Sequence, residues 1–242
     1  MRSKTFKRHL MTIAFMLFCI CINAADKLIT NQVTIRLDKA GTLPSKISDN
    51  EKYQITNLKI IGDINGTDVR LIRDMAGADT EGKETAGNLS TLDLSEANIV
   101  DGGELYYFSG FGTHDNIIGE YFFLKCNKLT SVTLPSVVEW IDNCAFDRCS
   151  SLVSLEIPFG VTSIGCYAFR ECSSLASVTI PSSVTSIGES AFIRCSSLTS
   201  VNIPSSITKI AQQLFSGCSS LTSMTIPSGV TSIERNAFHR CI

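Results

Sequence analysis

The sequence predicts a β-rich solenoid, in which a parallel sheet is built from stacked 23-residue coils that close through short turn or 3₁₀ segments. The first observation is a fixed period, because residues 195–217 are followed directly by a near-copy that starts at Cys218. The second is that residues of one type recur at this step. The recurring columns are Cys126, Cys149, Cys172, Cys195, Cys218 and Cys241; Phe123, Phe146, Phe169, Phe192, Phe215 and Phe238; and Pro135, Pro158, Pro181, Pro204 and Pro227. One coil cannot bury its own apolar residues, so such an array folds only by stacking.

Residues 1–24 predict a secretory signal peptide. Cations crowd residues 1–9, an apolar run covers residues 10–22, and small residues follow at Ala24 and Ala25. The apolar run is shorter than the roughly 20 residues that a membrane-spanning helix needs. We therefore expect cleavage after Ala24 and export to the cell surface or beyond.

Residues 25–88 predict an irregular N-terminal cap, which covers the apolar end of the array. Alternation of apolar and polar residues predicts a strand at residues 33–37, and residues 55–61 supply another. Thr67 with Asp68 can cap a short helix that runs through Met75.

Residues 89–117 predict an irregular repeat that contains an insertion. Leu89, Leu92 and Leu94 occupy the same relative places as the inward residues of the regular coils, and a loop rich in aromatic residues and glycine follows. The aromatic side chains singled out in this loop are Tyr106, Tyr107 and Phe111. Two interpretations stay open: the loop contacts a ligand, or its aromatic rings pack over the first regular coil.

Residues 118–242 form the regular array. In a typical unit, Leu198, Val201 and Ile203 point inward from a strand, and a proline ends that strand because it lacks an amide donor. Ile207 and Ile210 return along the opposite side, and Phe215 sits in the closing turn. Because Cys241 opens another unit, we expect the natural protein to continue.

The pattern Leu-x-x-Val-x-Ile-Pro-x-x-Val-x-x-Ile-Gly-x-x-Ala-Phe-x-x-Cys resembles the BspA-like (Treponema-type) leucine-rich repeats of secreted and surface proteins. The resemblance covers residues 118–242 strongly and residues 89–94 weakly. It implies a leucine-rich-repeat solenoid of the α/β horseshoe-like class and an adhesin-like protein that engages host matrix proteins or microbial surface proteins. The unit at residues 204–217 departs from the pattern at Ala211 and Leu214, which predicts altered packing there.

Charge and motifs exclude several function classes. The net charge is −2 and no basic patch follows from the sequence, so nucleic acid is not an expected partner. The chain lacks a glycine-rich phosphate loop between a strand and a helix. Nucleophilic catalysis needs a base beside a cysteine or serine, and beyond the signal segment the only histidines are His114 and His239. We expect no enzyme activity and no cofactor; a cysteine-dependent hydrolase is the enzyme alternative.

The cysteines admit three readings. Zinc prefers pairs of ligands two to four residues apart. Beyond the signal segment, the most closely spaced cysteines are Cys144 with Cys149 and Cys166 with Cys172, and no histidine lies in either unit, so we expect no metal. The column cysteines are expected to be buried thiols, because in-register neighbours rarely reach disulfide geometry. Cys144 and Cys166 lie off the column on adjacent coils and form the one candidate disulfide.

The outward side of the predicted strands is the candidate binding surface. Its side chains are short and nearly uncharged, and they line successive strands. The candidates are Thr133, Glu156, Thr179, Thr199, Ser200, Asn202 and Thr225, together with Tyr106, Tyr107 and Phe111. These residues either keep the strands soluble or bind an extended protein or, as the alternative, a glycan. The sequence therefore predicts a secreted or cell-surface, macromolecule-binding scaffold.

Overall fold

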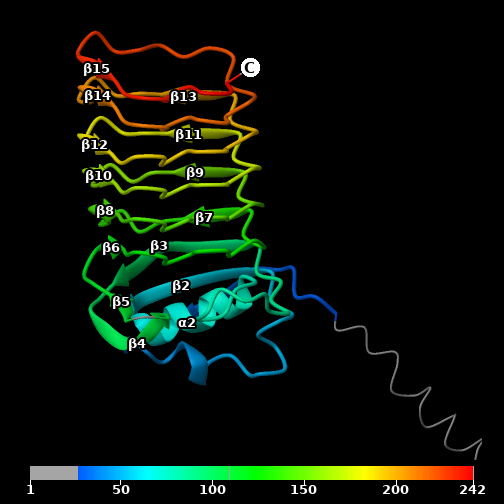
Figure 1. Cartoon of the computed structure of the whole chain (residues 1–242). Helices are drawn as coiled ribbons and strands as arrows, with labels where there is room; N and C mark the ends of the chain where they lie inside the picture. Colours follow the sequence, from blue (N-terminus) through cyan, green and yellow to red (C-terminus); the bar gives the residue numbers. More distant parts are fainter. Residues whose placement is uncertain (1–26, 109, 242) are drawn as a thin grey trace, which may run out of the picture.

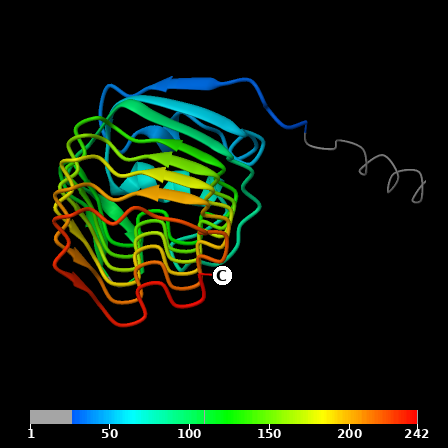
Figure 2. The ribbon, with the colours of Figure 1, turned by 90° about the horizontal axis from the view of Figure 1, so that it is seen from above.

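The structure is a computed structural model that describes residues 27–108 and 110–241, and these residues form a stack of coils (Figure 1). The predicted signal peptide lies outside the described residues. Successive coils pair their main strands in parallel in a seven-stranded sheet, which confirms the β-rich solenoid. Along the chain, these strands are β1 (Val33–Arg36), β2 (Asn57–Ile64), β3 (Thr91–Ile99), β7 (Ser131–Thr133), β9 (Ser154–Glu156), β11 (Ser177–Thr179) and β13 (Ser200–Asn202). The main sheet forms one side of the stack when it is viewed along its axis (Figure 2).

A second parallel ladder forms on the return side of each coil. Four short strands pair there in the order β12-β10-β8-β6, and β14 pairs with β15 alone. These strands are β6 (Ile117–Ile118), β8 (Trp140–Ile141), β10 (Ser163–Ile164), β12 (Ser186–Ile187), β14 (Lys209–Ile210) and β15 (Ser232–Ile233). Their isoleucines from Ile118 to Ile210 are buried, as the repeat pattern predicted.

The third side of each coil is a turn that is bonded to the next coil. The amides of Tyr121, Phe123 and Lys125 donate to carbonyl oxygens 22 residues later, at 3.2, 2.7 and 2.8 Å. Tyr121 and Lys125 have φ angles of 61° and 58°, in the left-handed region. The same backbone recurs in each regular coil. We call one of its two positions the left-handed column: Lys125, Arg148, Glu171, Arg194, Gly217 and Arg240.

Phenylalanine and cysteine columns fill the interior beside this turn. The Phe169 and Phe192 rings stack with centroids 5.1 Å apart and planes 8° apart, and the other members of the column from Phe123 to Phe238 stack likewise. Each column cysteine from Cys149 onward donates its thiol to a phenylalanine carbonyl of the preceding coil. For Cys195 this bond reaches the Phe169 oxygen at 3.1 Å. The cysteine column therefore links coils as well as filling space.

The N-terminal cap continues the main sheet with coils of unequal length. Val33 pairs with Leu58, Asn57 with Thr91, and Thr91 with Ser131. The pairing Leu92↔Val132 confirms that residues 89–94 occupy the place of a regular strand. Strand β2 and strand β3 both run further than predicted, to Ile64 and Ile99.

Helix α2 (Gly66–Met75) starts earlier than predicted, because Asn65 and not Thr67 is its N-cap. The Asn65 side chain accepts from the Thr67 amide, and the Asp68 carboxylate accepts from the Asn65 amide, which forms a capping box. The buried Asp68 carboxylate also accepts from the Leu43 amide at 2.8 Å, beside the 3₁₀ turn η1 (Leu43–Ser45). Asp68 thus ties the helix to the segment between β1 and β2.

Arg73 fixes the helix to the first regular coil. Its side chain is fully buried, and Nη1 donates to the carbonyl of Tyr121 at 2.7 Å while Nη2 donates to that of Asp79 at 2.9 Å. Burying this cation is favourable only because carbonyl oxygens surround it. The cap and the array therefore share one continuous core.

The array departs from regularity in two places. The second ladder breaks between β12 and β14, at the unit where Ala211 replaces the glycine of Gly165 and Gly188. A Cβ added at Gly188 would lie 2.5 Å from the amide nitrogen of Cys166, so the close approach of these coils depends on glycine. The second departure corrects our prediction of a strand that contains Thr225. No strand forms there: the main sheet ends at β13, although β15 of the same coil still pairs with β14 on the return side.

Candidate binding surfaces

The outward side of strands β7, β9, β11 and β13, which we call the main-sheet face, carries most of the predicted surface residues. Glu156 pairs with Thr179 across the β9–β11 ladder, and Thr179 pairs with Asn202 across β11–β13. The structure therefore brings these three side chains into one exposed row. Thr133, Thr199 and Ser200 are exposed on the same strands or at their edge, and Thr225 is exposed but lies outside the sheet.

A hollow of about 450 Å³ opens on this face between β7 and β9. Glu156 lines it together with Thr133 and Ser136, and the Phe159 ring stands at its rim with 78% of its surface exposed. Phe159 was missed in the sequence. The equivalent positions in the other units are Ser136, Ser182, Ser205 and Ser228, so the break in this serine column was a readable signal.

The aromatic insertion folds as a hairpin of β4 (Gly102–Tyr107) and β5 (Phe111–Thr113) against helix α2. Tyr106 is fully buried, packs against Phe122 and donates its hydroxyl to the Glu120 carbonyl at 2.9 Å. Its inclusion in a binding surface was therefore wrong, since no ligand can reach the ring. Tyr107 and Phe111 are half-buried around Tyr121, with each of their ring centroids 4.9 Å from that of Tyr121.

The packing interpretation of the insertion thus describes Tyr106, Tyr107 and Phe111. Two apolar side chains of the hairpin still face solvent, Leu105 and Phe108. The hairpin is held to the helix by the Glu104 amide, which donates to the Thr67 hydroxyl at 2.9 Å, and by an ion pair between Arg70 and Glu104.

The environment of the column cysteines disfavours the thiolate form. Burial raises the pKa of Cys126 to about 11 and that of Cys218 to about 12, and it raises the pKa of the other column cysteines as well. Burial also raises the pKa of Cys144 to about 11. A cysteine nucleophile works as a thiolate, so a raised pKa disfavours that chemistry at these positions.

Cys144 and Cys166 lie on adjacent coils, where the Cys144 amide donates to the Cys166 carbonyl at 2.9 Å. Both are half-buried free thiols in the structure. A disulfide between them stays a prediction. His114 lies away from them in the sequence, in the turn after β5, and its Nδ1 is 3.3 Å from an Asp101 oxygen.

Two further properties concern the described part of the chain. Within residues 27–108 and 110–241, no helix combines the length and the apolar character that crossing a bilayer requires. In the same residues, side chains of the metal-binding types do not gather in groups of three or more.

Stacked, in-register coils with a leucine, valine and isoleucine interior define the chain as a leucine-rich-repeat solenoid. The family model of the BspA type leucine-rich repeat region matches residues 116–242 in six copies. Since that match covers more than half of the sequence, the chain belongs to the BspA-type leucine-rich-repeat family. Proteins of this family are generally bacterial surface or secreted proteins that act as binding scaffolds.

Solved structures show the same architecture. A leucine-rich repeat protein from Bacteroides ovatus is 30% identical with a TM-score of 0.54; the match covers 66% of this chain and 40% of that protein. The chain therefore spans less than half of the Bacteroides protein. A leucine-rich repeat protein from Treponema pallidum is 22% identical with a TM-score of 0.51 and shows the fold alone; 84% of this chain and 73% of that one are covered. No curated protein sequence matches the chain.

Proposed function

We propose that this protein is a secreted or cell-surface, adhesin-like scaffold that binds an extended segment of a partner protein on its main-sheet face and catalyses nothing. The observation that carries the proposal is the hollow between β7 and β9, where an exposed aromatic ring and a carboxylate stand on an otherwise hydroxyl-rich, regular sheet. Exposed aromatic side chains beside polar groups are typical anchors of protein interfaces.

The chemistry of the hollow indicates the kind of segment it accepts. Phe159 offers a ring face, Glu156 offers an acceptor for a cation, and the neighbouring serine and threonine hydroxyls supply adaptable hydrogen bonds. A segment with a lysine or arginine followed by small polar residues would satisfy all three. The row Glu156, Thr179 and Asn202 continues these contacts across the next strands.

A carbohydrate-binding surface is the second candidate, because an aromatic ring beside hydroxyls also suits a sugar. The protein lacking residues 1–24 is screened against a panel of extracellular matrix and microbial surface proteins and against a glycan array. We expect saturable binding to a protein. Binding to sugars alone would reject the protein-binding proposal.

A cysteine-dependent hydrolase is the third and weakest candidate. The raised pKa of the buried thiols argues against it. Labelling of the native protein with a thiol-reactive probe decides the matter. Slow labelling confined to half-buried positions supports a binding scaffold, whereas one cysteine that reacts much faster than the rest would support the enzyme.

A further inference from the structure

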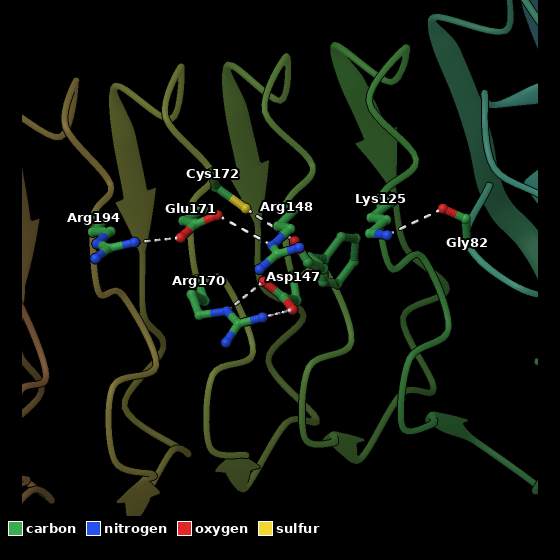
Figure 3. Close-up of polar contacts among 9 residues, drawn as sticks. Gly82, Lys125, Asp147, Arg148, Arg170, Glu171, Cys172 and Arg194 are labelled. Carbon is green, nitrogen blue, oxygen red and sulfur yellow. Dashed lines mark hydrogen bonds and ion pairs between the residues drawn. The ribbon is translucent and has the colours of Figure 1, made fainter. Parts of the chain in front are cut away.

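A second surface, distinct from the main-sheet face, is a groove of about 660 Å³ that runs along the stack beside the turn side. It follows the left-handed column from Lys125 to Gly217, and Figure 3 shows the column side chains Lys125, Arg148, Glu171 and Arg194. A row of small polar side chains forms its other wall, including Ser150, Ser173 and Ser196. Because each coil contributes one residue to each row, the groove suits a linear ligand that lies along the stack.

The left-handed column is basic on a chain of negative net charge. It contributes Lys125, Arg148 and Arg194 and one acid, Glu171, to the groove. A second acid, Glu84, lines the groove at its cap end, where it is paired with Lys128. Arg148 Nε lies 3.1 Å from one Glu171 oxygen, and Arg194 Nη1 lies 2.7 Å from the other. One carboxylate thus bridges two guanidinium groups from the coils on either side of it.

Both guanidinium groups keep donors for a ligand. A guanidinium carries five N–H donors, and in the described residues Arg148 and Arg194 each meet a carboxylate only at Glu171. Their side chains are 45% and 69% exposed, so these ion pairs are weak and can be exchanged. An anionic group that enters the groove can therefore replace or flank Glu171.

The serine row selects for a ligand that brings hydrogen-bond donors. Ser173 Oγ donates to the Ser150 carbonyl and Ser196 Oγ donates to the Ser173 carbonyl, each at 3.3 Å. With their hydrogens used, these hydroxyl oxygens present acceptor lone pairs. No aromatic or large aliphatic side chain lines the groove within the described residues, so it lacks the apolar pockets that anchor peptides.

We propose that this groove binds a linear acidic polysaccharide, whose carboxylates meet Arg148 and Arg194 and whose hydroxyl groups donate to the serine row. An acidic polysaccharide carries anions and many hydroxyl donors on one chain. An acidic peptide matches the cations but leaves its apolar and bulky side chains without pockets. A nucleic-acid backbone offers few donors to the serine oxygens.

The test measures binding of the protein lacking residues 1–24 to polygalacturonate by isothermal titration, with polyglutamate and neutral dextran in parallel. We expect polygalacturonate to bind, polyglutamate to bind at least about tenfold more weakly, and dextran not to bind. Affinity should fall as salt rises, because exposed charges are screened. Equal affinity for polyglutamate would replace the polysaccharide with an acidic peptide, and absence of polygalacturonate binding would overturn the proposal.

Two variants locate the site. R148Q/R194Q should lose about tenfold in affinity, because each charge-assisted hydrogen bond to an anion is strong. E171Q should gain affinity, because both guanidinium groups are released to the ligand. A merely structural role of the Arg–Glu–Arg bridge predicts loss in both variants, so a gain in E171Q separates the two. Thermal unfolding of each variant confirms that the protein is folded.

The matched control is R36Q/K46Q, which removes two exposed cations of the cap outside the groove. Its affinity for polygalacturonate should equal that of the parent protein. An equal loss in R36Q/K46Q and R148Q/R194Q would show attraction by net charge alone and would reject the groove. The main-sheet substitutions E156T/F159S should leave this binding unchanged, so failure here is distinguishable from failure of the proposed function.

Discussion

Left-handed backbone recurs twice in every regular coil and falls on a non-glycine residue each time except at Gly217, for example at Tyr167 and Glu171 with φ of 57° at both. Such backbone costs an L-residue about 1–2 kcal/mol. The cost is offset because the amides at these positions, from Tyr121 to Gly217, each donate to a carbonyl of the next coil. The turn side is therefore held by the stack and not by local sequence preference.

Substitution of Gln213, which has a φ of 54°, tests this strain. Glycine adopts this backbone without a Cβ clash, so Gln213→Gly should stabilise the protein by up to about 1 kcal/mol. Gln213→Val should destabilise it by about 1–2 kcal/mol, because a β-branched side chain tolerates the left-handed region poorly. Urea unfolding measures both.

Gln212, one position earlier, has ordinary backbone and provides the control. Gln212→Gly should destabilise the protein by about 0.5–1 kcal/mol, through the larger entropy of the unfolded chain. The same sign of change in Gln212→Gly and Gln213→Gly would contradict the strain assigned to the left-handed backbone at Gln213.

Glu171 should make the free energy of unfolding depend on pH in the acid range. Burial raises the pKa of Glu171, but the hydrogen bond from Arg194 and the charges of Arg148 and Arg194 outweigh it and hold the pKa below its ordinary value. A carboxyl whose folded pKa is lowered stabilises the fold fully above the unfolded pKa, near 4.3, and this contribution disappears as pH falls through the folded pKa.

The free energy of unfolding is therefore compared for the parent protein and Glu171→Gln from pH 7 down to about pH 3. We expect the parent to be more stable at pH 7 and the difference to vanish toward the acid end. The exposed Glu189, which forms no ion pair within the described residues, supplies the control Glu189→Gln. A difference that grows on acidification would show that Glu171 does not act as a paired carboxylate.

At the scale of the element, close contact between neighbouring coils on the return side requires glycine at Gly165 and Gly188. An added Cβ at Gly188 would lie 2.5 Å from the Cys166 amide nitrogen. Gly188→Ala should therefore separate β10 from β12 and destabilise the protein by roughly 2 kcal/mol or more, as other backbone clashes in packed positions do.

The control is Gly112→Ala in β5, where an added Cβ would touch only Leu105 Cδ2, at an ordinary 3.7 Å. Its free energy of unfolding should change by less than about 0.5 kcal/mol. The amide of residue 188 donates to the Ile164 carbonyl across the contact, so its hydrogen exchange should be faster in Gly188→Ala. Slower exchange in the variant than in the parent would contradict this account.

The elements that the sequence predicted are those that the 23-residue step repeats. The inward columns of Leu198, Val201 and Ile203 follow from periodicity alone, and all three side chains are buried. The cap was less readable, because Val33, Asn57 and Thr91 pair with residues 25, 34 and 40 positions later and no fixed step reveals them. The helix start differs from the prediction because the side chain of Asn65, and not that of Thr67, accepts the free amide of the first turn.

The candidate sites were only partly readable, for physical reasons that differ by residue. Glu156, Thr179 and Asn202 follow from strand alternation. The burial of Tyr106 depends on its contacts with Phe122 and with the Glu120 carbonyl. The sequence pattern of the hairpin does not predict these contacts. The groove depends on left-handed backbone at lysine and arginine residues, which carry no turn signature of their own.

At the scale of the whole molecule, each regular coil contacts chiefly its two neighbours, so coils should be removable as units. Deletion of residues 173–195 joins Cys172 to Ser196 and keeps every column in register. We expect a folded protein with cooperative urea unfolding and a smaller m-value, because less surface is exposed on unfolding.

Deletion of residues 173–184 is the matched control. It removes about half a coil and sets strand positions of one unit against turn positions of the next. This protein should lack a cooperative transition. Cooperative unfolding of the half-unit deletion, or its absence in the whole-unit deletion, would show that the units do not stack independently.

The central claim is that the repeat supplies the scaffold and that departures from it on the main-sheet face supply binding. E156T/F159S restores the residue types that other units carry at these positions, threonine at Thr133 and Thr179 and serine at Ser136 and Ser182. The decisive measurement is the affinity of this variant for the protein partner found in the panel screen.

We predict an unfolding curve that matches the parent and an affinity reduced by about tenfold or more, since a lost aromatic anchor typically costs at least about 1.4 kcal/mol. Unchanged affinity in the folded variant would contradict the account and would place the partner elsewhere on the solenoid.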